Sequence, residues 1–214
     1  MFAREVFMEP KLLLKGLAAS CVWLFLLVNV SPVQAEQFVR VLIAYHSVSG
    51  HTEKMAYAVA EGVRFVPGTR VRVERVAKVT AEVLFSADAV VVGSPVYWSN
   101  MAGEVKTFFD NWQLKFGVWP EMKMRNKVGA AFATGGQVSS GKEVTMLTIL
   151  AAMLGNHMIV VSGGGAFGAS ATTEGKSPGI DQDELADARA LGKRVAEVAW
   201  IVKKGGGNQH SAPK

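Results

Sequence analysis

Residues 46–52 read His-Ser-Val-Ser-Gly-His-Thr and directly follow an apolar run. Ser47, Ser49 and Thr52 bring hydroxyl donors into this short segment. Gly50 permits the positive φ of a tight turn, and a helix beginning near Thr52 would add free backbone N–H groups and the positive end of its dipole. This combination predicts a site for a terminal phosphomonoester, although a capped turn between a strand and a helix in any α/β protein has the same composition. No lysine follows the glycine as in the Walker loop, and the spacing does not match the dinucleotide-binding pattern.

Two further segments follow apolar runs in the same way, and their residues suit a flat ring. Residues 93–103 read Gly-Ser-Pro-Val-Tyr-Trp-Ser-Asn-Met-Ala-Gly, in which Tyr97 and Trp98 offer aromatic faces for stacking. The alternative is an aromatic anchor packed beneath a loop. After the next apolar run, Gly135 and Gly136 permit close approach of the backbone to a ligand. One phosphate-type loop and two ring-type loops together predict a pocket for a phosphorylated flat heterocycle.

Short apolar runs alternate with amphipathic stretches along most of the chain. We expect strands at residues 38–45, 70–76, 89–93, 127–134 and 158–161. We expect helices beginning near Thr52 and Asp181, and at residues 105–112 and 146–154. Asp181 and Glu184 form a capping-box pattern, and the glycines at 205–207 are expected to end the last helix.

Residues 70–76 alternate charged and apolar side chains, as a half-exposed strand does, whereas the other expected strands lack alternation, which indicates burial on both faces. The pattern therefore predicts an α/β fold with a doubly wound, five-stranded parallel sheet of order 2-1-3-4-5 in a three-layer α/β/α arrangement. In such sheets ligands bind at the carboxyl ends of the strands, where the winding reverses.

The first 35 residues differ in composition from the rest. A basic start precedes an uncharged apolar run at residues 16–30, and small residues follow up to Ala35. This order predicts a secretory signal peptide cleaved after Ala35, and the run is short for a membrane span. An uncleaved membrane anchor and a misassigned start of a cytoplasmic protein are the alternatives. We expect the ligand-binding domain at residues 36–204, a flexible tail at 205–214, and an exported mature protein, periplasmic or secreted.

The composition limits the chemistry of the domain. The chain of 214 residues is half hydrophobic and has a formal net charge of +5. Its one cysteine, Cys21, lies in the apolar run, so the mature domain would have no disulfide, no thiolate nucleophile and no cysteine-bound metal, and we expect no metal site. Lysines and arginines do not form a run interleaved with aromatic residues, which argues against a nucleic-acid partner. A mildly basic chain suits phosphate-bearing ligands or proximity to a negatively charged membrane.

Three stretches resemble the flavodoxin-like NAD(P)H:quinone oxidoreductases of the WrbA type. They read VLIAYHSVSGHTEKMAYAVAEGV, ADAVVVGSPVYWSNMAGEVKTFFDNW and NKVGAAFATGGQVSSGKEVTMLTILAAMLGNHMIVV. The resemblance extends over nearly all of residues 39–161, and the motifs Ser-x-x-Gly-His and Gly-Ser-Pro-x-x-x-x-Asn-Met-x-Gly are specific in combination. It implies a flavodoxin-like fold that binds flavin mononucleotide (FMN) without a covalent link.

The resemblance also implies which residues contact the cofactor. The FMN phosphate would be held by Ser47, Val48, Ser49, Gly50, His51 and Thr52. The isoalloxazine and ribityl would be lined by Pro95, Val96, Tyr97, Trp98, Ser99 and Asn100, and wrapped on the other side by Thr134, Gly135 and Gly136. Asn156 falls where family members often have a histidine over the flavin. The neighbouring His157 is a candidate catalytic residue, and it reads equally as the first residue of a strand.

By this resemblance the chain is an FMN-dependent oxidoreductase that passes hydride from NADH or NADPH through bound FMN to a quinone, as a homodimer or higher homo-oligomer. The cofactor carries the chemistry and the protein supplies position. Two alternatives stay open: a one-electron carrier of the flavodoxin type, and a flavodoxin-like interaction module without cofactor. Carriers of that type are usually strongly acidic, whereas this chain is basic. A module would be expected to lose the hydroxyls of the phosphate-type loop, and they are all present.

Overall fold

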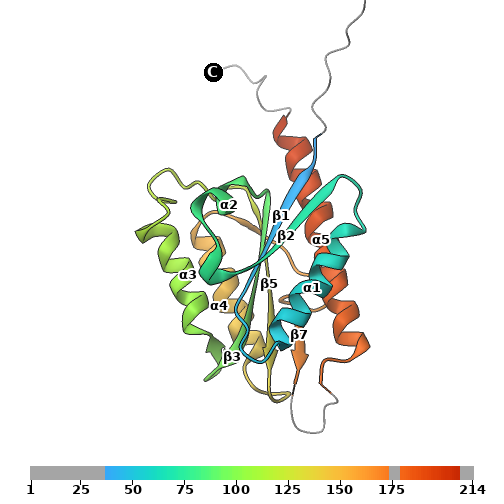
Figure 1. The fold of residues 1–214 in the computed structure, drawn as a ribbon. Helices are drawn as coiled ribbons and strands as arrows, with labels where there is room; N and C mark the ends of the chain where they lie inside the picture. The colour runs from blue at the N-terminus through green and yellow to red at the C-terminus, as the bar shows by residue number, and fades with distance from the viewer. Residues whose placement is uncertain (1–36, 174–178, 208–214) are drawn as a thin grey trace, which may run out of the picture. The chain divides into compact units, whose positions relative to one another are not determined.

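A parallel sheet lies between two layers of helices in the computed structural model, which describes residues 37–173 and 179–207 (Figure 1). The predicted signal peptide at 1–35 and residues 208–214 of the predicted tail lie outside these ranges. Glu36–Lys214 is one compact unit, and its buried apolar side chains lie between Val39 and Ala199. Within the described ranges, no helix combines the length and the apolar character needed to cross a membrane.

Five parallel strands form the main sheet, in the order β2-β1-β3-β5-β6. They are β1 (Val39–Tyr45), β2 (Thr69–Arg75), β3 (Ala89–Tyr97), β5 (Val128–Gly135) and β6 (Ile159–Val160). The predicted fold class and strand order are confirmed, with β5 and β6 in the fourth and fifth places. Every residue of β5 is buried, which explains why the central strands are apolar along their whole length.

Two short strands have no counterpart in the sequence-based prediction. β7 (Ala169–Thr172) pairs with the second half of β5, whereas β6 pairs with its first half, so two segments share the fifth position of the sheet. β4 (Asn100–Met101) runs antiparallel to the end of β3 and forms a hairpin with it. Both strands are too short, and β7 too rich in small residues, to produce a strand-like hydrophobic pattern.

The helices are α1 (His51–Arg64), α2 (Ala81–Ser86), α3 (Gly103–Leu114), α4 (Lys142–Gly155) and α5 (Gln182–Gly207). α1 and α5 pack on one face of the sheet, and the other three pack on the opposite face (Figure 1). The capping box is confirmed, because Glu184 N–H donates to Asp181 Oδ1 at 2.8 Å and Asp181 N–H donates to Glu184 Oε2 at 3.1 Å. The predicted end of this helix is wrong, since α5 continues through Gly207.

Two glycines allow α1 and α5 to pack closely. A Cβ atom at Gly62 would lie 1.9 Å from the carbonyl oxygen of Arg189, and one at Gly192 would lie 2.0 Å from that of Val59. The two helix backbones therefore approach more closely than any side chain would permit. This contact fixes the position of α1, whose first turn follows the end of β1.

We expect Gly192→Ala to destabilise the domain by about 1–3 kcal/mol, the usual cost of overpacking. The added methyl group would collide with backbone, which cannot rotate away as a side chain could. Gly205→Ala in the same helix is the control, because a Cβ atom there would meet nothing within 4 Å in the described chain. Urea unfolding followed by circular dichroism measures both variants, and equal stabilities would contradict the role of Gly192.

Candidate functional site

The carboxyl ends of β1, β3 and β5 meet at one edge of the sheet, where the chain forms a cavity of about 160 Å³ (lower edge in Figure 1). The residues that line it follow these strands: Val48, Ser49, His51, Thr52, Pro95, Val96, Tyr97, Thr134, Gly135, Gly136 and Thr173. The three segments that the sequence singles out therefore surround one cavity. Thr173 is an additional lining residue, which sequence patterns miss because they do not predict β7.

Residues 46–50 make a tight turn into α1. Gly50 has a φ of 86°, the left-handed conformation that glycine adopts most easily, and its N–H donates to Ser47 Oγ at 3.1 Å. Ser47 and Gly50 thus shape the turn and do not line the cavity themselves. Ser49 Oγ lies 2.9 Å from His51 Nδ1. The first N–H groups of α1 have no acceptor within the helix, and the helix dipole adds positive charge, so this turn suits an anion such as a phosphomonoester.

A buried hydrogen bond joins the phosphate-type loop to the segment after β5. Thr52 Oγ1 and Thr134 Oγ1 lie 2.8 Å apart, and both side chains are almost fully buried. A buried hydroxyl without a partner would cost about 1–3 kcal/mol. The pair therefore fixes the spacing of two walls of the cavity.

Arg75, at the end of β2, supports the phosphate-type loop from outside the cavity. Its guanidinium donates to the Ser47 carbonyl at 2.7 Å and pairs with Glu53 at 3.3 Å. The Tyr45 hydroxyl donates to the other carboxylate oxygen of Glu53. Burial, reinforced by Glu53, raises the pKa of Tyr45 to about 12, so this hydroxyl stays a donor at neutral pH. No motif marks Arg75 in the sequence, because the pairing of β1 with β2 is what brings it to the loop.

Trp98 and Ser99 form the two-residue turn between β3 and β4, with φ values of 49° and 59°. Positive φ at both positions is characteristic of a type I′ hairpin, and it costs about 1–3 kcal/mol for each non-glycine residue. The turn leaves Trp98 fully exposed, next in the chain to Tyr97, which lines the cavity.

Asn100 anchors this hairpin to α4. Its side-chain oxygen accepts from Met101 N–H at 2.7 Å and from the Thr148 hydroxyl at 3.0 Å. Trp98, Ser99 and Asn100 form and hold the hairpin beside the cavity and are not among the residues that line it, so their predicted contacts with the isoalloxazine and ribityl stay a prediction.

The loop after β5 folds tightly against the cavity wall. A Cβ atom at Gly135 would lie 2.1 Å from Ser140 Oγ, so this glycine is needed for packing within the loop. The buried Lys142 amino group donates to the Thr172 hydroxyl at 2.6 Å and to the Gln137 carbonyl at 3.3 Å. Lys142 thus ties the loop to β7. A lysine in the first turn of a helix gives no sequence signal for such a role.

Asn156 and His157 lie at the opposite edge of the sheet. α4 begins after the cavity loop and returns the chain over about 21 Å to the edge where the strands begin. Asn156 Nδ2 donates to the Ala152 carbonyl at 2.8 Å, and the His157 carbonyl accepts from Asn126 N–H at 3.0 Å, just before β5. In a single chain Asn156 and His157 therefore lie away from the cavity, and their predicted position over the flavin stays a prediction.

The groups around the cavity can bind and orient a ligand. His46 supports Tyr97 edge-on, with ring centroids 6.5 Å apart, and its Nε2 lies 3.6 Å from a Glu104 oxygen. Among residues 37–173 and 179–207, no group of three or more histidine, cysteine, aspartate or glutamate side chains is placed to hold a metal ion.

Comparison with known proteins identifies the family. The family described as NADPH-dependent FMN reductase matches residues 69–173, which include β3, β5 and the loops after them. The NAD(P)H dehydrogenase (quinone) of Chromohalobacter salexigens is 33% identical over 197 residues, which cover 75% of this chain and 96% of that protein. The protein of the same name from Archaeoglobus fulgidus is 33% identical over 194 residues, covering 75% of this chain and 97% of that protein. The chain belongs to the NAD(P)H dehydrogenase (quinone) family.

Solved structures agree with this assignment. The flavodoxin, WrbA-like protein from Agrobacterium tumefaciens superposes with a TM-score of 0.62 at 25% identity, over 76% of this chain and 98% of that one. A flavodoxin from the domain Archaea has the same fold, with a TM-score of 0.61 at 22% identity over 76% of this chain and 99% of that one. Both proteins align over nearly their whole length while part of this chain stays unmatched. The shared fold therefore does not require the unmatched part of this chain.

We expect Ser49→Glu to weaken FMN binding at least about tenfold more than Ser49→Gln does. The two side chains have the same size, but the carboxylate would repel the FMN phosphate at the start of α1. Ser49 is exposed, so neither variant should unfold the domain. FMN fluorescence titration measures both Kd values, and equal values would contradict the placement of the phosphate at this loop.

Proposed function

We propose that this chain is an FMN-dependent oxidoreductase that transfers hydride from NAD(P)H through bound FMN to quinones. One observation carries the proposal: a loop suited to a phosphate and two loops suited to a flat ring surround a single cavity at the carboxyl edge of the sheet. The relatives named NAD(P)H dehydrogenase (quinone) and the FMN reductase family indicate the donor, the cofactor and the acceptor.

The residues around the cavity fit FMN. The hydroxyls of Ser49 and Thr52 and the first N–H groups of α1 would bind its phosphate. The Tyr97 segment on one side, and Gly135 and Gly136 on the other, would hold the ring system. FMN supplies two-electron redox chemistry when bound, and the chain supplies its position and its exclusion from bulk water.

The exposed Trp98 gives the chain a means of orienting substrates beside the cavity. A strained turn holds this indole in water, which is costly unless the ring has a partner. We infer that Trp98 stacks on the quinone or nicotinamide ring. Trp98→Ser should then raise KM for the quinone or the nicotinamide while FMN affinity stays unchanged, and an unchanged KM for both would refute this role.

The two alternative functions are disfavoured. The net charge of +5 is unlike that of an acidic electron carrier. The phosphate-type loop keeps Ser47, Ser49 and Thr52, which a cofactor-free module would not need.

Anaerobic addition of NADPH or NADH to the FMN-loaded protein should bleach the flavin absorption, and a benzoquinone should restore it. FMN that stays oxidised with both donors would contradict the proposal and favour the electron carrier. A protein that binds no FMN would favour the cofactor-free module. The control is the Ser49→Glu variant mixed with the same amount of FMN. Because this variant is expected to bind FMN weakly, it measures how much free flavin reacts with NADPH or NADH.

The predicted homodimer or higher homo-oligomer stays a proposal, and α4 supports it. Val144, Leu147 and Leu154 are exposed, and their spacing in sequence puts them on one face of this helix. Contact with a second copy would remove this apolar stripe from water. Sedimentation velocity measures the mass, and a monomer would contradict the proposal.

We also propose export with cleavage after Ala35, on the basis of the basic start, the apolar run at residues 16–30 and the small residues before the cleavage position. The exported protein should begin at Glu36, which intact-mass spectrometry measures. A protein that keeps Met1 would refute cleavage. If this uncleaved protein is recovered in the membrane fraction, residues 1–35 are favoured as a membrane anchor. If it is recovered in the cytosol, a misassigned start is favoured.

A further inference from the structure

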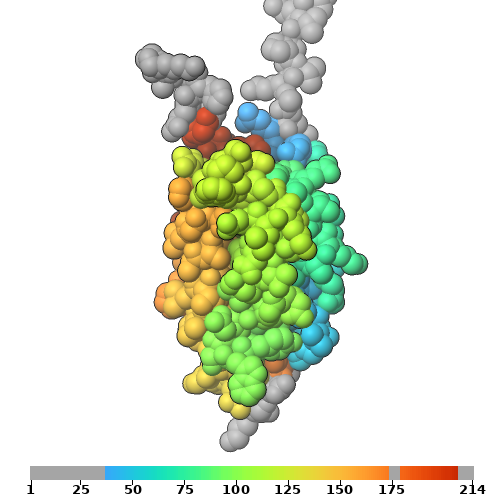
Figure 2. Space-filling view, turned by 90° about the vertical axis from the view of Figure 1, so that its left-hand side faces the viewer, coloured from blue at the N-terminus to red at the C-terminus, as the bar shows by residue number. Residues whose placement is uncertain are grey.

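The edge of the sheet opposite the cavity, where the strands begin, carries a concentration of basic side chains. The start of β1, the end of α5 and residues 115–127 come together at this end of the molecule (Figure 2). We define the basic edge by its exposed cations, which are Arg40, Arg70, Arg72, Lys123, Arg125 and Lys204.

Two hollows on the basic edge are lined by these cations. Arg40, Arg70 and Arg72 line a groove of about 160 Å³ beside α2. Lys123 and Arg125 contribute to a second hollow of about 280 Å³ beside the last turns of α5. Arg72 is paired with Glu74 at 3.1 Å, so Arg40 and Arg70 in the groove and Lys123 and Arg125 in the second hollow are the cations open to a phosphate-bearing group.

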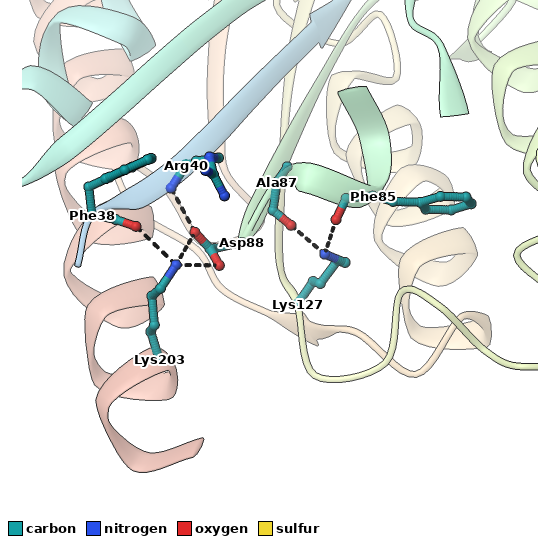
Figure 3. A network of polar contacts seen from close by, with 7 residues as sticks. All are labelled: Phe38, Arg40, Phe85, Ala87, Asp88, Lys127 and Lys203. Atoms are coloured by element: carbon teal, nitrogen blue, oxygen red, sulfur yellow. Dashed lines mark hydrogen bonds and ion pairs between the residues drawn. The ribbon is translucent and has the colours of Figure 1, made fainter. Parts of the chain in front are cut away.

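The charges beneath the basic edge are already engaged with one another (Figure 3). Lys203 Nζ contacts both carboxylate oxygens of Asp88, at 2.9 and 2.8 Å. Lys127 Nζ donates to the carbonyls of Phe85 and Ala87, and burial lowers its pKa. Asp88 is thus occupied by an internal contact and does not neutralise the exposed cations.

Helix dipoles explain only part of this charge. In the doubly wound fold the helices end at this edge, and a basic residue in the last turn, such as Arg64 or Lys204, stabilises the helix. Arg40 and Arg70 belong to strands, however, and Lys123 belongs to a loop. These cations do not lie in the last turn of a helix, so a helix dipole does not account for their presence at this edge.

Apolar side chains lie among the cations. The guanidinium groups of Arg40 and Arg70 lie 4.5 and 3.5 Å from the ring centroid of the half-buried Phe38. Trp119 and Ile201 are 64% and 65% exposed. Exposed aromatic and aliphatic groups interspersed with lysine and arginine are typical of surfaces that lie in the headgroup region of a bilayer.

We propose that the basic edge docks the domain on an anionic lipid bilayer. The cations would contact lipid phosphates, and Trp119 and Ile201 would lie at the boundary of the acyl chains. Gln37, the first described residue, lies at this edge because it closely precedes β1. The exposed apolar groups favour lipid over a nucleic acid, whose grooves and phosphates would leave them in water.

This orientation has a consequence for the redox site. β1 spans about 23 Å between the two edges, so the cavity would face away from the bilayer and take its acceptor from the aqueous phase. The docking proposal does not depend on the redox function, since neither hollow shares a residue with the cavity.

Co-sedimentation of Glu36–Lys214, the compact unit that holds the core, with vesicles tests the proposal. Vesicles of phosphatidylglycerol and phosphatidylcholine are compared with vesicles of phosphatidylcholine alone, at low and high salt. The test variant replaces four cations of the basic edge by glutamine: Arg70→Gln, Lys123→Gln, Arg125→Gln and Lys204→Gln. The control makes the same change of charge at exposed sites elsewhere: Lys78→Gln, Lys106→Gln, Lys193→Gln and Arg194→Gln.

We expect salt-sensitive binding to the anionic vesicles. The test variant should bind more than about a hundredfold more weakly, because each basic side chain near the surface contributes about a fivefold factor, and the control should bind almost as the parent does. Equal losses in the two variants would show an effect of net charge alone and overturn the proposal. Absence of anionic-vesicle binding, or tighter binding to duplex DNA than to these vesicles, would also overturn it. Unchanged circular dichroism and FMN content show that both variants are folded.

Discussion

Parallel pairing of β1, β3 and β5 is the constraint on which the rest of this structure depends. In the register of the sheet, Tyr45 pairs with Gly93 and Pro95 pairs with Thr134, so the three strands end at the same edge. A phosphate-type turn by itself would hold an anion weakly, and an aromatic loop by itself would hold no particular ring. The cavity exists because hydrogen bonding between parallel strands delivers both kinds of loop to the same place.

Residues outside the cavity give its walls their positions. The guanidinium of Arg75 holds the turn before α1 through the Ser47 carbonyl, and the buried Thr52–Thr134 pair links that turn to β5. Asn100 and Thr148 hold the strained hairpin against α4. Loops usually carry the groups that contact a ligand, and a rigid scaffold must position them. In this chain the scaffold includes a network of polar contacts as well as the sheet.

The same topology sorts the charges of the molecule. Helices that begin at the carboxyl edge carry acidic residues in their first turns, including Glu53, Glu104, Glu143 and Glu184. Their last turns lie at the other edge, where strand and loop cations add to the positive charge. The redox site and the basic edge therefore occupy opposite ends of the sheet, and a contact at one end leaves the other free.

Apolar runs were sufficient to predict the central strands, because burial on both faces of a parallel sheet leaves a clear pattern, and the alternation of residues 70–76 was sufficient to predict the half-exposed strand β2. The capping box at Asp181 and Glu184 was equally predictable, since all its contacts lie within one turn. The strand β7 was missed because its four small residues carry no pattern. Asn156 and His157 lie at the other edge of the sheet because α4 runs away from the cavity, and a motif gives distance along the chain but not which end of a helix faces the ligand.

By itself, the sequence determined the three loop chemistries, the parallel fold and the family, since each depends on residues close together in the chain. Only the tertiary structure decided that Arg75 and Lys142 support the site, that Thr173 lines it and that Asn156 does not. It also decided that cations far apart in the sequence form one edge. These outcomes depend on strand pairing and on the direction of each helix, and so bring together residues from distant parts of the chain that no local pattern relates.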